Sequence, residues 1–328
     1  MLFRSMGSDS KQVSKIPEID LSGLHPSVAG GERWEAAKAE VAAALFSHGC
    51  FQAYFPSCSH ELREAMFGSA LPEIFALPLE TKQRLKSEDL YQGYIGQIPH
   101  LAYESLSFDD PLSPTAVDEF TKLMWPEGNS SFSKTVDAFA KALHELMEMV
   151  EKMIVESLGV EKHYDSFKSS ITYTVQLSEY GVPLNQDTKI ALDPHKNPNL
   201  LTILCQSKIE GLEVQTFDGD WVRVKPSPNS FTVIVGQVFE AWSNMRVRAP
   251  NHCVRVLVKE KRFSALFTSR PSLNSIVKGP EELGDEGHPL LFKPFNYTGF
   301  IKFIYSEEGW KTKDPFNAYC RIGNEEAA

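Results

Sequence analysis

Apolar and polar positions along the chain change their spacing near residue 171. Before that point apolar residues recur every three or four positions, a spacing typical of amphipathic helices. The clearest run lies between residues 131 and 158. Its apolar stripe consists of Val136, Phe139, Leu143, Met147, Val150, Ile154 and Leu158. From residue 171 the spacing becomes two, which is typical of strands. The pattern therefore predicts helices that support a β-sheet core.

Short segments after residue 171 have the β-branched, alternating composition of strands. They are 172–177, 189–192, 200–205, 212–217, 221–224, 231–235, 254–258 and 263–267. Asp218-Gly219 between two of them is a common hairpin turn. This succession predicts an α+β fold dominated by β, with a double-stranded β-helix, or jelly roll, at its core and supporting N-terminal helices. The mouth of such a barrel commonly binds a small ligand.

The sequence outside this core predicts further helices and one strand. A helix is predicted over 33–48 and ends at the following Gly49. A second helix is predicted over 61–75, with Ser59 as its N-terminal cap. A third helix is predicted over 297–305, and a strand over 51–55. Residues 79–103 are irregular. The expected organisation is a disordered lead-in (1–15), a mostly helical region (16–165), the jelly roll (166–275) and a C-terminal segment whose helix packs on the core (276–328).

Composition narrows the classes of partner. The chain has 328 residues, 42% of them hydrophobic, and a net charge of −10. That charge disfavours nucleic acid and anionic membrane surfaces. No apolar run reaches the ~20 residues of a membrane span. The five cysteines are odd in number and lack metal-ligand spacing, which favours a reducing compartment. We expect a cytoplasmic, monomeric protein with a small-molecule substrate.

Candidate chemistry gathers around two histidines and an Arg-x-Ser. His195 and Asn197 stand at i and i+2, so in a strand they face the same side. His252 must come from another strand of the sheet to join them. Two imidazoles and a carboxylate form the facial triad that holds non-haem Fe(II). Arg262 and Ser264 offer a planar cation and a hydroxyl that suit a carboxylate ligand.

These residues carry a family resemblance. His195-x-Asn197, His252 and Arg262-x-Ser264 resemble the His-x-Asp, His and Arg-x-Ser pattern of the plant 2-oxoglutarate- and Fe(II)-dependent dioxygenases. Segments 91–99, 103–106, 211–215, 225–231 and 288–295 resemble the subgroup that contains glucosinolate side-chain and auxin-oxidising enzymes. The resemblance covers about 16–320.

The resemblance implies an oxidoreductase of plant specialised or hormone metabolism that uses Fe(II) and 2-oxoglutarate. His195, His252 and the residue at position 197 would hold the metal. Tyr180, Arg262 and Ser264 would hold the co-substrate.

The chain departs from the family at position 197, where Asn197 replaces the liganding aspartate. An amide offers an oxygen but no negative charge, so metal affinity should fall. Asp193, at i−2 from His195, is a candidate substitute ligand. Gln237 and Met245 also differ from the family pattern, which suggests a rebuilt pocket. Lys196 is expected to point to solvent.

Several alternatives remain open for this site. The metal could be zinc, or the site could hold no metal. A redox-inactive descendant could use His195, His252 or Asp193 for acid–base chemistry such as cyclisation, isomerisation or elimination. The chain could also bind a small molecule without catalysis. Asn197 could finally be an engineered substitution for aspartate.

Overall fold

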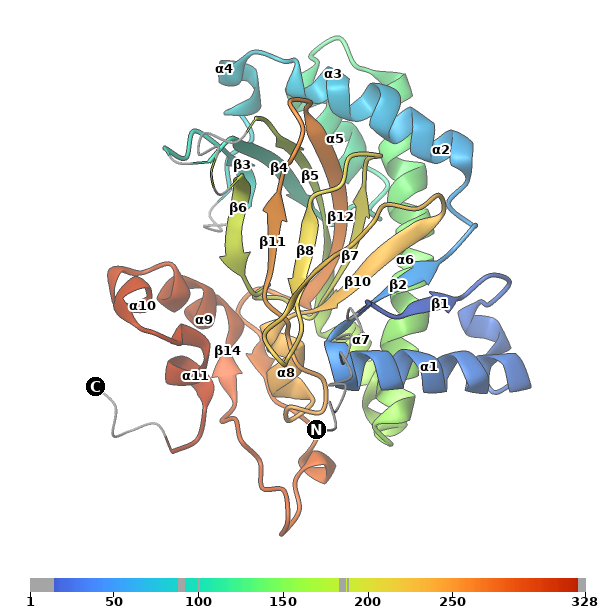
Figure 1. Cartoon of the computed structure of the whole chain (residues 1–328), viewed down its shortest axis with the longest axis vertical. Helices are drawn as coiled ribbons and strands as arrows, with labels where there is room; N and C mark the ends of the chain where they lie inside the picture. Colours follow the sequence, from blue (N-terminus) through green and yellow to red (C-terminus); the bar gives the residue numbers. More distant parts are fainter. Residues whose placement is uncertain (1–14, 88–91, 100, 183–186, 188, 324–328) are drawn as a thin grey trace, which may run out of the picture.

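Two β-sheets form the centre of the molecule (Figure 1). The computed structural model describes residues 15–87, 92–99, 101–182, 187 and 189–323. The predicted lead-in therefore lies, apart from Lys15, outside the described residues. The larger sheet contains, in order, β1 (Glu18–Asp20), β2 (Cys50–Tyr54), β10 (Ser230–Val235), β7 (Leu201–Gln206), β12 (Arg262–Pro271), β5 (Ile171–Tyr180), β4 (Tyr103–Asp109) and β3 (Gly93–Ile95).

The smaller sheet contains, in order, β6 (Ile190–His195), β11 (His252–Arg255), β8 (Leu212–Gln215) and β9 (Trp221–Arg223). Every strand predicted after residue 171 is present, and these strands are shared between the two sheets. The predicted jelly roll is confirmed. Asp218-Gly219 joins β8 to β9 as a hairpin, with Gly219 at a φ of 96°.

Strand ends are the main difference from the predicted core. β6 continues past Leu192 to His195, and β11 begins at His252 rather than Val254. β6 tolerates Pro194 because it is the edge strand of its sheet, where a missing N–H breaks no ladder. Both histidines therefore lie within strands.

The N-terminal region contributes helices and further strands. Helix α1 (Glu32–His48) ends at Gly49, which has a φ of 68°. Helix α2 (His60–Ala65) begins at Ser59, whose side chain accepts a hydrogen bond from the Leu62 N–H. The predicted helix over 61–75 is not uniform, because a π-helical segment (Met66–Ala70) separates α2 from α3 (Leu71–Phe75). Helices α4 (Leu79–Lys82) and α5 (Ala116–Met124) follow.

Residues 79–103, expected to be irregular, contain the short α4 and β3 (Gly93–Ile95), and the longer strand β4 (Tyr103–Asp109) begins at their end. β3 pairs with β4, and β4 pairs along its whole length with β5. β4 was not predicted because it carries buried serines where a buried strand usually carries aliphatic residues. Tyr94 packs partly buried against the core, whereas Tyr91 lies outside the described residues.

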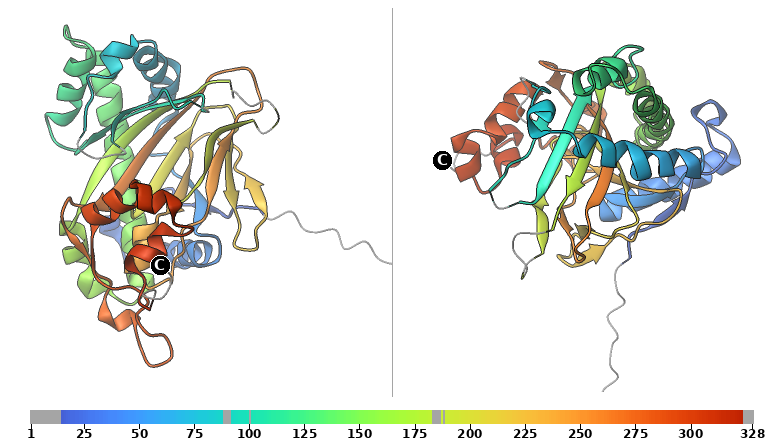
Figure 2. Two further views of the ribbon diagram at one scale, coloured as in Figure 1. Left: turned by 90° about the vertical axis from the view of Figure 1, so that its left-hand side faces the viewer. Right: turned by 90° about the horizontal axis from the view of Figure 1, so that it is seen from above.

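Helix α6 (Ser130–Ser157) supports the larger sheet and contacts β7 and β12. Its predicted apolar stripe is buried, apart from the half-buried Leu158 just after its end. Figure 2 shows α6 and α1 on one side of the sheets and the C-terminal helices on another. These are α9 (Tyr297–Ile304), which confirms the predicted helix, α10 (Glu307–Lys311) and α11 (Pro315–Cys320). No helix within the described ranges is long and apolar enough to cross a membrane.

Helix α6 also buries one carboxyl group completely. Glu151 is 0% exposed, and its Oε1 has no hydrogen-bond partner among the described residues. Its Oε2 lies 3.6 Å from Lys168 Nζ and 3.4 Å from the Tyr173 hydroxyl. Burial raises the pKa of Glu151 to about 7, while Lys168 opposes that rise and Glu148 adds to it.

The raised pKa predicts a pH-dependent cost. Because the folded pKa of Glu151 exceeds the unfolded one, stability falls as pH rises from about 4.5 to about 7. Glu151→Gln should therefore match the wild type near pH 5 and exceed it at pH 8 by on the order of 2 kcal/mol. Urea unfolding at both pH values measures this. Asp137→Asn, on the same helix but solvent-accessible, is the control. An equal effect of Glu151→Gln at both pH values would contradict the prediction.

Candidate active site

Two antiparallel strands bring the histidines together. His195 on β6 and His252 on β11 are directly opposite in the strand pairing, and their ring centroids are 4.3 Å apart. His252 is buried and His195 is partly buried. The two imidazoles therefore face one cavity, as the sequence predicted.

Backbone carbonyls fix how each ring is protonated. His195 Nδ1 lies 2.8 Å from Asp193 O, and His252 Nδ1 lies 3.4 Å from Pro250 O. A carbonyl only accepts, so each Nδ1 carries the hydrogen and each Nε2 keeps its lone pair. Burial lowers the pKa of both rings, and for His252 the neighbouring His195 adds to this effect. Both imidazoles are thus suited to bind a divalent metal.

Asn197 completes the set of donors with an amide. Its Nδ2 donates to Thr202 Oγ1 at 2.9 Å, and Asn199 Nδ2 donates to the same hydroxyl at 2.9 Å. Because the nitrogen of Asn197 is engaged by Thr202, the amide oxygen is the atom left for the site. Within the described part of the chain, no group of three His, Cys, Asp or Glu residues could hold a metal. The donor set fits a divalent ion with two imidazoles and one neutral oxygen.

Asp193 does not join this set. Its side chain is exposed and does not line the cavity; its contact with His195 is made by the backbone carbonyl. The pairing passes from His195–His252 to Leu192–Val254, so β6 carries one extra residue. Such a bulge changes the alternation of side chains, which explains why Asp193 and His195 do not share a face.

A cavity of about 400 Å³ lies beside the histidines. Its polar lining consists of Tyr103, Gln176, Tyr180, His195, Lys196, Asn197, His252 and Tyr305. Its apolar lining consists of Ile95, Ile98, Leu192, Pro198, Leu204, Leu212, Val254, Leu266 and Ile304. The mixture fits a small molecule that is largely apolar.

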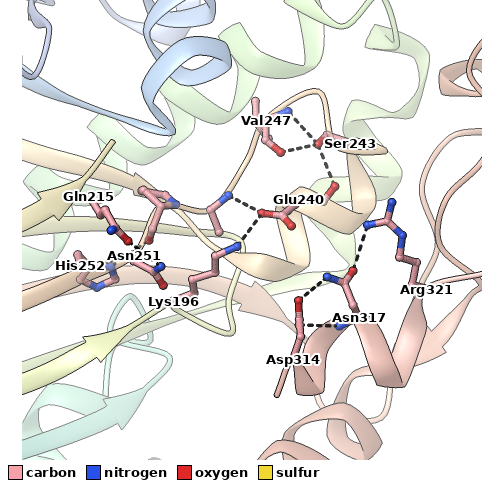
Figure 3. A network of polar contacts seen from close by, with 12 residues as sticks. Lys196, Gln215, Glu240, Ser243, Val247, Asn251, His252, Asp314, Asn317 and Arg321 are labelled. Atoms are coloured by element: carbon pink, nitrogen blue, oxygen red, sulfur yellow. Dashed lines mark hydrogen bonds and ion pairs between the residues drawn. The ribbon is translucent and has the colours of Figure 1, made fainter. Parts of the chain in front are cut away.

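Two expectations about the pocket were wrong. Gln237 and Met245 are not among the described residues that line the cavity. Gln237 opens α8 (Gln237–Trp242), and Met245 has a φ of 66°, a left-handed conformation that favours glycine. Lys196 does not point to solvent: its Nζ is 3.7 Å from Glu240 Oε2 (Figure 3). It also lines the cavity. β6 ends at His195, so strand alternation does not extend to Lys196.

Arg262 is fully buried near this cavity. Its Nη2 donates to Gln206 Oε1 at 2.9 Å, and its guanidinium lies 4.7 Å from the centre of the Tyr180 ring. Ser264 Oγ donates to the Tyr180 hydroxyl at 3.3 Å. Nε and Nη1 of Arg262 have no hydrogen-bond partner among the residues that the structure describes. A buried cation with free N–H groups fits a small-molecule carboxylate.

Gly211 makes room for this arginine. A Cβ at Gly211 would come within 2.8 Å of Arg262 Cδ and Nε. Tyr180 lines the cavity, whereas Arg262 and Ser264 contact Tyr180 but do not line the cavity. The predicted carboxylate-binding residues are therefore together, with the tyrosine ring nearest to the cavity.

Some site residues were missed by sequence reasoning. The side-chain oxygen of Gln206 accepts a hydrogen bond from Arg262, and its side-chain nitrogen donates to Val224 O at 3.0 Å. Thr202 orients Asn197. Gln176 donates to the Tyr103 hydroxyl at 2.8 Å, and both line the cavity. The available signal was a polar residue inside or at the end of an otherwise apolar strand.

Known proteins resemble the chain over nearly its whole length. Residues 168–271 match the 2OG-Fe(II) oxygenase superfamily, and residues 16–126 match the non-haem dioxygenase in morphine synthesis N-terminal family. The Arabidopsis thaliana probable 2-oxoglutarate-dependent dioxygenase AOP1.2 is 39% identical over 314 residues, 93% of this chain and 96% of its own. The Arabidopsis probable inactive 2-oxoglutarate-dependent dioxygenase AOP2 is 33% identical over 403 residues, covering 97% and 99%.

Solved structures agree with these matches. The rice dioxygenase for auxin oxidation superposes with a TM-score of 0.74 at 27% identity, covering 88% of this chain and 95% of the rice chain. JOX2, solved in complex with 2OG, Fe and JA, gives a TM-score of 0.74 at 24% identity, covering 89% and 86%, which shows the shared fold. With its relatives matched almost end to end, the chain belongs to the 2-oxoglutarate-dependent dioxygenases of the 2OG-Fe(II) oxygenase superfamily.

Proposed function

We propose that this protein is a 2-oxoglutarate-dependent oxygenase that oxidises a small, largely apolar molecule of plant specialised or hormone metabolism. The observation that carries the proposal is the buried Arg262: its Nε and Nη1 have no hydrogen-bond partner among the described residues, and Tyr180, which its guanidinium contacts, lines the same cavity as His195 and His252. A buried cation without a carboxylate partner is costly, and a bound co-substrate would offset that cost.

The chain's own residues would divide the work as follows. His195, His252 and the Asn197 oxygen would hold Fe(II). Arg262 and Ser264 would hold the far carboxylate of 2-oxoglutarate, with Tyr180 beside them. Bound iron, co-substrate and oxygen together supply the oxidising chemistry. The apolar wall of the cavity would position the substrate and exclude water.

We further propose that the metal site is weakened rather than lost. In both imidazoles Nδ1 faces a backbone carbonyl and leaves Nε2 with its lone pair, and Thr202 holds the amide nitrogen of Asn197, which leaves its oxygen as the possible metal ligand. None of these three proposed ligands, His195, His252 and Asn197, carries a negative charge. We expect the metal to bind best together with the dianionic co-substrate, which supplies that charge.

An anaerobic titration tests this proposal. Purified protein is titrated with Fe(II) and 2-oxoglutarate while the visible charge-transfer band of the chelate is followed. A saturating band that disappears in His252→Ala is the expected result. If no band forms with the wild type at millimolar Fe(II), the proposed oxygenase is wrong.

The absent carboxylate favours one second candidate, metal-independent acid–base chemistry in the same cavity. The two facing histidines support it, because burial lowers the pKa of both rings and keeps them available as bases. Asp193 does not, because its side chain is exposed and outside the cavity. Turnover that persists with a chelator and without oxygen would favour this candidate. Saturable ligand binding without any product would instead indicate a non-catalytic binder.

The cellular setting is also a proposal. We infer a cytoplasmic monomer without nucleic-acid partners. All five cysteines are buried and unpaired, which fits a reducing compartment, and the net charge of −10 opposes binding to nucleic acid.

A further inference from the structure

A single buried carboxylate oxygen contacts both segments that carry the histidines. Glu240, on α8, is 3% exposed. Its Oε2 accepts a hydrogen bond from the Ala249 N–H at 2.7 Å and lies 3.7 Å from Lys196 Nζ. Lys196 directly follows His195, and Ala249 precedes His252 by three positions. Figure 3 shows the Lys196 side chain reaching toward Glu240.

The helix that carries Glu240 is itself fixed to the site. The N–H of Gln237 donates to Asn197 O at 2.8 Å, and the N–H of Val238 donates to Asn199 O at 3.0 Å. On its other side, the Phe239 and Trp242 rings pack on Phe167 with centroid distances of 5.7 and 5.0 Å. The backbone of the Asn197 segment is therefore hydrogen-bonded to the start of helix α8, and the helix is packed against Phe167.

We propose that Glu240 is a positioning residue that sets the separation of His195 and His252 from behind the cavity. Glu240 does not line the cavity, so it acts through Lys196 and Ala249. Without its carboxylate, the buried Ala249 N–H loses its acceptor and Lys196 loses its anion, which frees both segments. The consequence for metal binding rests on the proposed function; the consequence for the rings does not.

The first measurement needs no metal. The ring nitrogens of both histidines are observed by ¹H–¹⁵N NMR in the metal-free protein. Glu240→Ala is expected to shift or double the signals of both rings. Lys196→Met, which keeps the Ala249 hydrogen bond, is expected to move the His195 signals alone. Glu151→Gln, which removes a different buried carboxylate, is the matched control and should move neither.

The second measurement uses Co(II) as a spectroscopic probe in the presence of 2-oxoglutarate. Glu240→Ala is expected to weaken Co(II) binding by about tenfold or more and to change the visible spectrum of the ion. Glu240→Gln, which keeps an acceptor for Ala249, should recover most of the affinity. It also serves as the test if the alanine variant fails to fold, since His195 signals should still move when the charge is lost.

The outcomes are separable. Unchanged ring signals in Glu240→Ala, or in Glu240→Gln if only that variant folds, would overturn the positioning role whatever the metal does. Ring signals that move in Glu240→Ala, together with a wild-type protein that binds no Co(II), would contradict the proposed oxygenase and leave the role of Glu240 standing.

Discussion

Replacing Asn197 with aspartate is expected to tighten Fe(II) binding at least tenfold, or about 1.4 kcal/mol. The change adds a negative charge where two neutral imidazoles already point their lone pairs. Two imidazoles with one carboxylate are the donor set that non-haem Fe(II) prefers. A dication gains more from a carboxylate than from an amide oxygen in a site of low dielectric constant.

The local structure can accept this substitution. In the present structure Asn197 donates to the Thr202 hydroxyl, which also accepts from Asn199. A hydroxyl has one donor and two acceptor sites. With aspartate at 197, Thr202 can donate to the new carboxylate and still accept from Asn199. The hydrogen bond is reversed rather than lost, so little stability should be lost with it.

Fe(II) affinity would be measured by anaerobic titration with a saturating amount of 2-oxoglutarate. Asn251→Asp is the matched control, because it adds the same charge next to His252 on an exposed side chain. That control should change the affinity less than twofold. If both variants bound Fe(II) equally more tightly, the gain would come from the electrostatic field of the added charge and not from a metal ligand at position 197.

Replacing Arg262 with leucine is expected to weaken 2-oxoglutarate binding by at least a hundredfold, about 2.7 kcal/mol. The carboxylate would lose Nε and Nη1 of Arg262, which have no hydrogen-bond partner in the described part of the chain. The same change should leave the stability of the unliganded protein unchanged or raise it by about 1 kcal/mol. Removing a buried cation is favourable, while the loss of the Gln206 hydrogen bond and the contact with the Tyr180 ring partly cancels that gain.

Calorimetric titration with 2-oxoglutarate and urea unfolding without it measure the two effects separately. Lys261→Met is the control, since Lys261 is the neighbouring cation but is exposed and paired with Glu179. It should change neither quantity appreciably. Retained co-substrate binding in Arg262→Leu would mean that the carboxylate is held elsewhere.

The core of the fold was predictable because its strands are apolar runs separated by turns. β7 and β10 are almost entirely buried, so their composition alone marks them. β4 was missed because its buried Ser105 and Ser107 resemble turn residues; Ser107 Oγ donates to Gly93 O at 3.4 Å, a partner that exists only after folding.

The candidate site was predictable to a smaller extent. The positions of His195, His252, Arg262 and Ser264 follow from strand alternation and family spacing. The exposed position of Asp193 does not, because the bulge that turns it outward depends on how β6 pairs with β11.

Residues that act through distant partners were also hidden from sequence reasoning. Gln206 meets Arg262, and Glu240 meets both Ala249 and Lys196, only in the folded chain. A single sequence gives the composition of each strand or helix but not which of its polar side chains will face another segment.

The larger sheet has a consequence for how the protein unfolds. β2 hydrogen-bonds to β10, and β4 hydrogen-bonds to β5, so strands from the first third of the chain cover both outer sides of the four jelly-roll strands in that sheet. The two regions should therefore melt in one cooperative transition. A shortened chain beginning at residue 168 would expose two long unpaired strand edges, and we expect it to self-associate through them rather than fold as a monomer.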